Sequence, residues 1–260
     1  MDSSLFLHYG PGGSSDIEAA VLGSQWPNVL FWNQPKFKDR LNPYQELVNA
    51  CAQQAQEMQA KQMIGHSFGC DLLSSILKTK LPQLPHLVVE NSILISPLRS
   101  IPTAFINLGR VLQRKQDVPA LAEAIQSVAP FLSAPPPDLF WNLIIQISTH
   151  PFYLQSFWAN QKAKENSDKL AALSTPFDAA EWQTLVNDYL FAYKNSDTNH
   201  LKNKKIKAIF GDSDPYLDEN DFTFWKNLLG LEQVIIIKNS GHYPHLENQE
   251  AFLRSVKVLK

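Results

Sequence analysis

The pentapeptide Gly65–Gly69 (Gly-His-Ser-Phe-Gly) constrains the fold of this chain more than any other stretch. The apolar pair Met63-Ile64 precedes it, and a pattern typical of a helix follows from Cys70 to Leu77. A strand, a sharp turn and a helix in that order hold the central residue, Ser67, on a strained turn that projects its hydroxyl clear of the sheet. Strand and helix can approach each other only if the flanking residues are small, and both are glycines. The stretch therefore predicts a serine presented at a strand–helix junction.

Composition narrows the class of protein. The 260 residues are 44% apolar and 18% charged, which is typical of a globular chain that can bury a substantial core. A net charge of −2 provides no electrostatic footprint for nucleic acid or for an anionic membrane. We therefore expect no nucleic-acid partner.

The same sequence bears on the compartment. No apolar run approaches the roughly 20 residues of a membrane span, and no basic segment precedes an apolar stretch near the N-terminus. The two cysteines, Cys51 and Cys70, both fall in predicted helices and make a poor disulfide framework. We expect no membrane span, no signal peptide and a cytoplasmic protein with reduced thiols.

Strand and helix patterns alternate in the first and last parts of the chain. Apolar runs predict strands at residues 4–8, 28–32, 61–64, 87–96, 206–210 and 233–238. Helical patterns occupy residues 14–22, 42–60, 70–77, 219–229 and 246–259. Alternation of this kind favours an α/β fold with a mostly parallel central sheet flanked by helices.

The pattern changes between residues 99 and 203. This segment has no strand signal, and it contains helical candidates at residues 103–115, 119–129, 138–148, 151–165 and 178–193, with many large aromatic residues. We expect an all-helical cap domain over residues 99–203, inserted after the strand that ends near Pro97. Residues 1–98 and 204–260 would then form the α/β core domain.

A serine hydroxyl becomes a good nucleophile only when a base takes its proton and a third group orients the base. The loops after two late strands provide both kinds of residue. Asp212 and Asp214 follow the strand at 206–210, and His242 follows the strand at 233–238. His66 and His245 are alternative bases, and a simple helix-capping role for Ser67 is the alternative to catalysis.

These motifs together resemble the α/β-hydrolase family, and the resemblance covers nearly the whole chain. It is carried by five stretches: the pentapeptide, Gly211-x-x-Asp214, Ser240-Gly241-His242, His8-Tyr9-Gly10-Pro11-Gly12 and Ser96-Pro97. The resemblance implies a nucleophile at Ser67, a general base at His242 and an orienting acid at Asp214. Asp214 is preferred to Asp212 because the acid of this family usually stands three residues after the glycine.

The resemblance also implies an oxyanion hole built from two backbone N–H groups. One would come from Phe68, and the other from Gly10 in the first loop, with Tyr9 as the alternative. Tyr9 stands where the family usually has glycine, so the sequence leaves this choice open. Cys70 also replaces a frequent glycine, and we expect it to be a helix-packing residue.

The remaining sequence motifs do not indicate a metal site, a cofactor site or a second catalytic site. His86, His150 and His200 have no metal-ligand spacing, and no glycine-rich phosphate loop is present. We therefore predict no cofactor and no metal. The acid pairs Asp178/Glu181 and Asp218/Glu219 are interpreted as helix N-termini.

The resemblance implies a serine hydrolase that cleaves a carboxylic ester through an acyl-enzyme, with a small-molecule ester as its substrate. The aromatic cap indicates an apolar acyl or alkyl group of small or medium size. One alternative is a methyl ester esterase that acts on a pimeloyl-carrier protein in biotin synthesis; its acidic partner would bind a basic rim of Arg99, Arg110, Arg114 and Lys115. Thioesterase, carbon–carbon hydrolase, lactonase and iminopeptidase activities are further alternatives, and a non-catalytic binding module is the alternative from another class.

Overall fold

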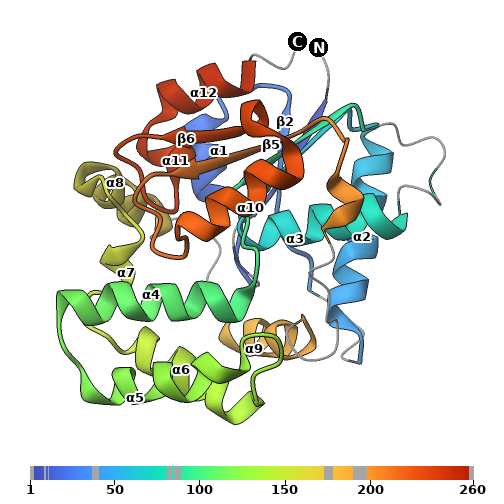
Figure 1. The fold of residues 1–260 in the computed structure, drawn as a ribbon. Coiled ribbons are helices and arrows are strands. Elements are labelled where there is room, and N and C mark those ends of the chain that lie inside the picture. Colours follow the sequence, from blue (N-terminus) through green and yellow to red (C-terminus); the bar gives the residue numbers. More distant parts are fainter. Residues whose placement is uncertain are drawn as a thin grey trace.

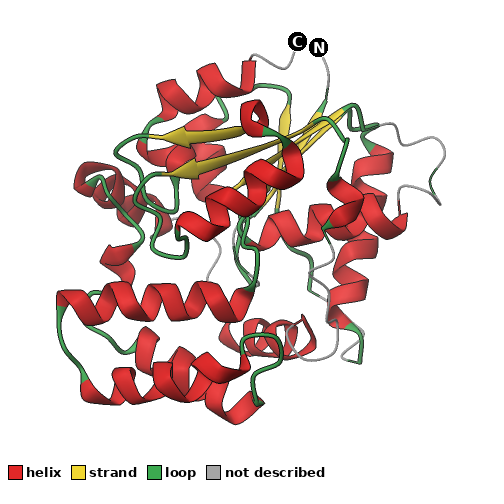
Figure 2. Ribbon diagram, in the orientation of Figure 1, coloured by secondary structure: helices red, strands yellow, loops and turns green. Residues whose placement is uncertain are grey.

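A six-stranded, fully parallel sheet forms the centre of the protein (Figures 1 and 2). The computed structural model describes residues 3–8, 10, 12–36, 41–80, 84, 89–172, 178–189 and 198–257. The strands follow the order β2-β1-β3-β4-β5-β6. Their bounds are β1 Ser4–Leu7, β2 Val29–Trp32, β3 Gln62–His66, β4 Asn91–Ile95, β5 Ile206–Gly211 and β6 Val234–Ile237. The predicted fold class is confirmed, and residues 87–88 of the fourth predicted strand lie outside the described residues.

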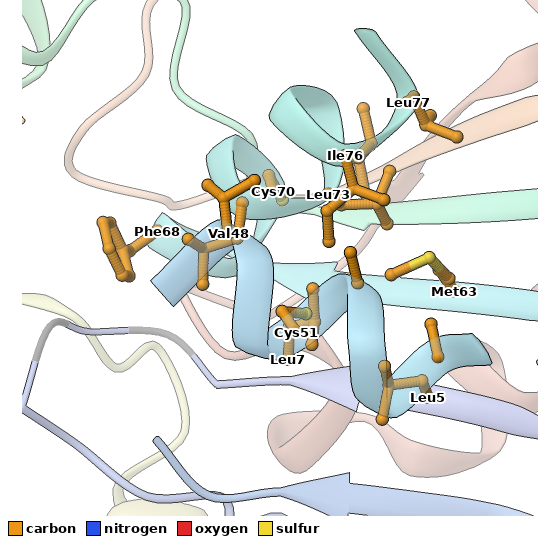
Figure 3. Packing of buried hydrophobic residues seen from close by; sticks show 14 of the residues in the cluster. Leu5, Leu7, Val48, Cys51, Met63, Phe68, Cys70, Leu73, Ile76 and Leu77 are labelled. Carbon is orange, nitrogen blue, oxygen red and sulfur yellow. The ribbon is translucent and has the colours of Figure 1, made fainter. Parts of the chain in front are cut away.

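Alternation along each strand divides the core between the two faces of the sheet. In β1, Leu5 and Leu7 enter one buried cluster, whereas Phe6 enters another. The first cluster packs against α2 (Pro43–Glu57) and α3 (Phe68–Ser75), as Figure 3 shows. The second includes Phe252 from the C-terminal helix. Apolar side chains on both faces are what a parallel sheet covered by helices requires.

The remaining helices complete the two layers and the segment between β4 and β5. Their bounds are α1 Asp16–Leu22, α4 Ile101–Lys115, α5 Pro119–Val128, α6 Pro137–Ser148, α7 Tyr153–Ser156, α8 Gln161–Ala171, α9 Ala179–Asn187, α10 Glu219–Leu229, α11 Pro244–Glu247 and α12 Gln249–Lys257. Short 3₁₀ turns lie at Ala129–Phe131, Asn199–Leu201 and Leu231–Gln233, and a π-helical turn at Ile76–Lys80 continues α3.

The segment from 99 to 203 contains helices and no strand in its described residues. Helices α4, α5 and α6 pack around their own apolar cluster, which includes Leu108, Leu121 and Phe140. They lie to one side of the sheet (Figure 1). The division of the chain into core and cap domains remains a prediction.

The single helix predicted at 151–165 is wrong, because the chain forms α7 and α8 there. Between them, the backbone N–H groups of Ala159 and Asn160 donate to the Glu247 carboxylate. The Asn160 side chain then caps α8 by accepting from Ala163 N at 3.1 Å. A contact with a residue far along the chain thus interrupts a locally helical pattern.

The predicted helix at 246–259 is also two helices, α11 and α12. Asn248 lies between them with non-helical backbone angles, φ −138° and ψ 68°. Its side chain accepts from Ala251 N at 3.3 Å, as an N-capping asparagine does. Residues 258–259 lie outside the described residues, as do residues 190–193 of the helix predicted at 178–193. None of the described helices is both long enough and apolar enough to cross a membrane.

Candidate active site

All six strands run in the same direction, so their C-terminal ends meet at one edge of the sheet. Gly10 follows β1, Ser67 follows β3, Asp214 follows β5 and His242 follows β6. The parallel topology therefore gathers residues from four distant parts of the sequence. Three of these residues are nearly inaccessible: Ser67 is 7% exposed, Asp214 6% and His242 3%.

Ser67 occupies the strained turn that the pentapeptide predicts. Its φ is 52° and its ψ is −113°, a conformation that L-residues rarely adopt. A Cβ atom on Gly65 would lie 2.4 Å from the Gly69 carbonyl oxygen, and one on Gly69 would lie 2.5 Å from the Leu7 oxygen. Only glycine fits at both positions. The Ser67 side chain makes no capping hydrogen bond to α3, so the helix-capping alternative is wrong.

The structure pairs His242 with Asp214. The Nδ1 atom of His242 lies 2.8 Å from Asp214 Oδ2, and both side chains are buried. Asp214 Oδ1 accepts from Tyr216 N at 3.0 Å. A carboxylate accepts the proton on Nδ1, which leaves the lone pair of His242 on Nε2. The imidazole thus has the tautomer that a general base requires.

The alternative acid, Asp212, is placed differently. Its side chain is 25% exposed, lies 3.8 Å from Lys238 Nζ and accepts from Ser240 N at 3.3 Å. Asp212 therefore shapes the turn, and no described contact joins it to a histidine.

The two alternative bases form a separate group. His66 Nε2 lies 2.8 Å from the backbone carbonyl oxygen of His242, so it donates a hydrogen bond there. His66 Nδ1 and His245 Nε2 both face Glu18 Oε1, and the three side chains are fully buried. Burial lowers the pKa of both histidines, and for His66 the neighbouring histidines lower it further. No pattern in the sequence indicated that Glu18 would lie here.

The first loop approaches the turn that carries Ser67. Besides the Leu7 oxygen, a Cβ atom on Gly69 would lie 2.8 Å from the His8 carbonyl oxygen, so the end of β1 touches the start of α3. His8 is buried, and burial lowers its pKa to about 4, so it is neutral near pH 7. Gly10 follows closely in this loop, whereas Tyr9 lies outside the described residues.

Glu247 is a site residue that the sequence analysis missed. Its Oε1 accepts from Gly241 N at 2.7 Å, and its Oε2 accepts from Ala159 N at 2.7 Å and Asn160 N at 2.8 Å. Burial raises its pKa, although the N–H donors act in the opposite direction. The carboxylate therefore joins the loop that carries His242 to the α7–α8 connection. In the sequence, only its position five residues after His242 could have suggested that Glu247 lies near the site.

Aromatic side chains surround the imidazole of His242. Its ring centroid lies 4.9 Å from that of Tyr216, 5.5 Å from that of Tyr243 and 5.9 Å from that of Phe157. The backbone N–H of His242 also donates to the Phe157 carbonyl oxygen at 2.8 Å. The helical segment therefore touches the loop of the candidate base directly.

Two further observations concern Cys70 and a cavity elsewhere in the molecule. Cys70 is buried with its Sγ 3.1 Å from the Gly65 carbonyl oxygen, and burial raises its pKa, as expected for a packing residue. A cavity of about 430 Å³ lies between β2 and α2, but its lining includes none of the residues Ser67, Asp214 and His242.

Comparisons with known proteins identify the fold. No protein-family model matches this sequence, and no curated protein sequence matches it. Solved structures do: a proline iminopeptidase-related protein from Thermus thermophilus is 19% identical with a TM-score of 0.70, over 99% of this chain and 88% of that one. An esterase from Exiguobacterium antarcticum is 11% identical with a TM-score of 0.64, over 99% of this chain and 91% of that one.

A third similar structure is an alpha/beta hydrolase enzyme from a deep-sea metagenome library. It is 11% identical with a TM-score of 0.56, over 99% of this chain and 88% of that one. The chain therefore has the α/β-hydrolase fold. Each of these proteins shares its strand and helix arrangement with the chain at low sequence identity.

Proposed function

From the α/β-hydrolase fold and the residues gathered at its sheet edge, we propose that the protein is a serine hydrolase that cleaves carboxylic esters. Ser67 is the nucleophile, His242 the general base and Asp214 the acid that orients it. The observation that carries this proposal is the 2.8 Å contact between His242 Nδ1 and Asp214 Oδ2, at the same sheet edge as a serine on a strained turn. Fold alone would not require all three residues.

The chemistry follows from these groups. His242 Nε2 takes the proton of Ser67 as its Oγ attacks the ester carbonyl, and the resulting oxyanion is bound by the N–H groups of Phe68 and Gly10. The imidazolium returns the proton to the departing alcohol, leaving an acyl-enzyme. Water, activated by His242, then attacks the acyl carbon and releases the carboxylic acid.

The substrate's acyl or alkyl group is apolar and of small or medium size. Tyr216, Phe157 and Phe105 form a connected aromatic group that begins at His242 and extends into the helical segment. Aromatic rings packed against the base would favour a hydrocarbon group there and exclude water from the acyl-enzyme. In this proposal, residues 99–203 act as a cap over the site.

A carrier-protein ester is a less favoured substrate. Arg110, Arg114 and Lys115 are exposed or partly exposed on α4, as a basic rim would require. Arg99, however, lies 3.5 Å from the buried Asp221 and stacks over Phe224, so its charge is already paired within the chain. Small-molecule esters therefore remain the first choice.

A fluorophosphonate probe and a panel of p-nitrophenyl esters, from acetate to dodecanoate, test the proposal. We expect the probe to modify Ser67, identified by peptide mass spectrometry, and the panel to show turnover at one range of chain length. Ser67→Ala should abolish labelling and lower kcat by roughly 10⁶-fold. L-proline p-nitroanilide joins the panel because a similar structure is that of a proline iminopeptidase-related protein.

Ser213→Ala is the matched control. Ser213 is exposed and precedes Asp214 in the chain, but its hydroxyl donates to Asp212 at 3.2 Å and has no place in the mechanism, so labelling should be unchanged. A protein that is folded but never labelled would favour a binding module. Labelling without ester turnover would favour another of the serine-hydrolase chemistries.

A further inference from the structure

Glu18, His66 and His245 form a fully buried cluster built from three distant parts of the chain. Glu18 lies on α1, His66 ends β3 and His245 lies on α11, and each is 0% exposed. Each offers one ligand atom, and the three atoms lie within 4.8 Å of one another. Two imidazoles and a carboxylate form a donor set typical of zinc sites.

The separations in the cluster suit a shared ion better than direct hydrogen bonds. His245 Nε2 lies 3.5 Å from Glu18 Oε1, and His66 Nδ1 lies 3.9 Å from the same oxygen. Both distances exceed the usual N–H···O length of about 2.7–3.2 Å. An ion equidistant from these atoms and in their plane would lie no more than about 2.4 Å from each, close to the roughly 2.0–2.2 Å of zinc–ligand bonds.

The hydrogen bonding of His66 fixes which of its nitrogens can act as a ligand. Its Nε2 donates to the His242 carbonyl oxygen at 2.8 Å, so Nε2 carries the proton. In that tautomer the lone pair of the ring is on Nδ1, which faces Glu18 Oε1 at 3.9 Å. Metal-binding histidines almost always donate their second N–H to a carbonyl or carboxylate in this way.

The charge of the cluster also calls for a cation. Neither carboxylate oxygen of Glu18 makes a hydrogen bond of ordinary length among the described residues, and its recorded ion-pair contacts are with the two histidines. The rings of Phe6 and Phe252 pack against His245, so apolar side chains border the cluster on that side. An isolated buried carboxylate is costly, and a bound cation would offset that cost.

We propose that Glu18, His66 and His245 bind one divalent transition-metal ion, with Zn²⁺ the best match to the donor set. The ion would have a structural role, because it would join α1, the end of β3 and α11. With three protein ligands, the fourth position of the ion would be taken by a water molecule. The proposal does not depend on the hydrolase activity.

Metal content measured on untagged protein tests this site. Because the cluster is buried, the ion must enter during folding, so the protein is unfolded and refolded with Zn²⁺ or with Co²⁺, then freed of loose metal by gel filtration. We expect about one ion per chain by mass spectrometry. We also expect visible d–d absorption in the Co²⁺ form and a higher Tm than that of protein refolded with a chelator.

Glu18→Gln and His245→Gln should each reduce the bound metal at least tenfold and abolish the Co²⁺ spectrum. His150→Gln, which changes a buried histidine outside the cluster, should retain both. Glu18→Gln and His245→Gln are both used so that the test still gives a result if one of them fails to fold. The proposal is overturned if the refolded wild type holds no metal; a buried water would then be the best occupant of the cluster. It is also overturned if both variants bind as much metal as the wild type.

Discussion

The Nε2 atom of His66 donates to the backbone carbonyl oxygen of His242 at 2.8 Å, although the two residues are 176 positions apart in the chain. The Ser96 hydroxyl reaches the same oxygen at 3.3 Å. His66 directly precedes Ser67, so these bonds attach the loop of the proposed base to the strand that presents the proposed nucleophile. A small displacement of either part would change the geometry on which proton transfer depends.

Asp214 should matter far more to activity than Asp212. Asp214→Asn removes the carboxylate that holds His242 in the required tautomer, and we expect kcat to fall by about 10⁴-fold. Asp212→Asn is the matched control. This side chain is partly exposed and only shapes the turn, so its substitution should lower kcat by less than about tenfold. Steady-state kinetics on the preferred ester measure both, and equal losses would contradict the assignment.

Gly241 should tolerate no side chain. A Cβ atom there would lie 2.2 Å from the Phe157 carbonyl oxygen, so Gly241→Ala must push the His242 loop away from the helical segment. We expect the free energy of unfolding to fall by about 2 kcal/mol or more. The corresponding loss in Tm is roughly 5 °C, measured by calorimetry.

Gly10→Ala is the comparison for that experiment. A Cβ atom on Gly10 would meet no atom within 4 Å, so the Tm of the Gly10→Ala variant should stay within about 1 °C of that of the wild type. Similar losses in the two variants would show that the contact with Phe157 is not the cause.

The Glu247 carboxylate should be needed as an acceptor. It takes hydrogen bonds from three backbone N–H groups, and Glu247→Gln replaces one acceptor oxygen with an NH₂ group that faces a donor. Leaving buried donors unpaired costs about 1–3 kcal/mol each, so chemical denaturation should show a loss in that range. Glu250→Gln changes an exposed carboxylate and should stay within about 0.5 kcal/mol of the wild type. Equal stabilities would contradict the bridging role.

Asp71 should make stability depend on pH. Burial raises its pKa to about 7 from 3.8, against a hydrogen bond to Tyr189. Because the folded state favours the protonated form, the contribution of Asp71 is fully present below about pH 4 and is lost as the pH rises through about 7. Asp71→Asn removes this dependence, so the Tm of the wild type should fall relative to that of the variant between about pH 4 and 7 and change little above that range.

Asp168→Asn is the control for the pH series. The Asp168 side chain is 60% exposed and pairs with Lys164. The Tm of the Asp168→Asn variant should therefore follow that of the wild type over the same pH range. A constant difference between wild type and Asp71→Asn across the series would contradict the raised pKa.

Local sequence patterns were sufficient to predict much of the fold of this protein. The alternation of strand and helix patterns predicted all six strands and the fold class, and the pentapeptide predicted the turn at Ser67. These features depend on neighbouring residues: the period of apolar side chains and the steric demand for glycine on either side of the serine. The two helices that proved to be split show the limit, because contacts with Glu247 and a cap at Asn248 override a continuous helical pattern.

Tertiary structure decided which polar groups meet. Asp212 and Asp214 stand two residues apart in one loop, and only the alignment of β5 with β6 shows that Asp214 reaches His242. Glu18, His66 and His245 have no spacing that would mark them as a group, yet parallel packing places them together in the interior. Sequence patterns report the surroundings of each residue along the chain, whereas these contacts arise from how strands and helices far apart in the chain are stacked. For the same reason, the turn that presents Ser67 could be predicted from five residues, but its partners could be identified only in the folded molecule.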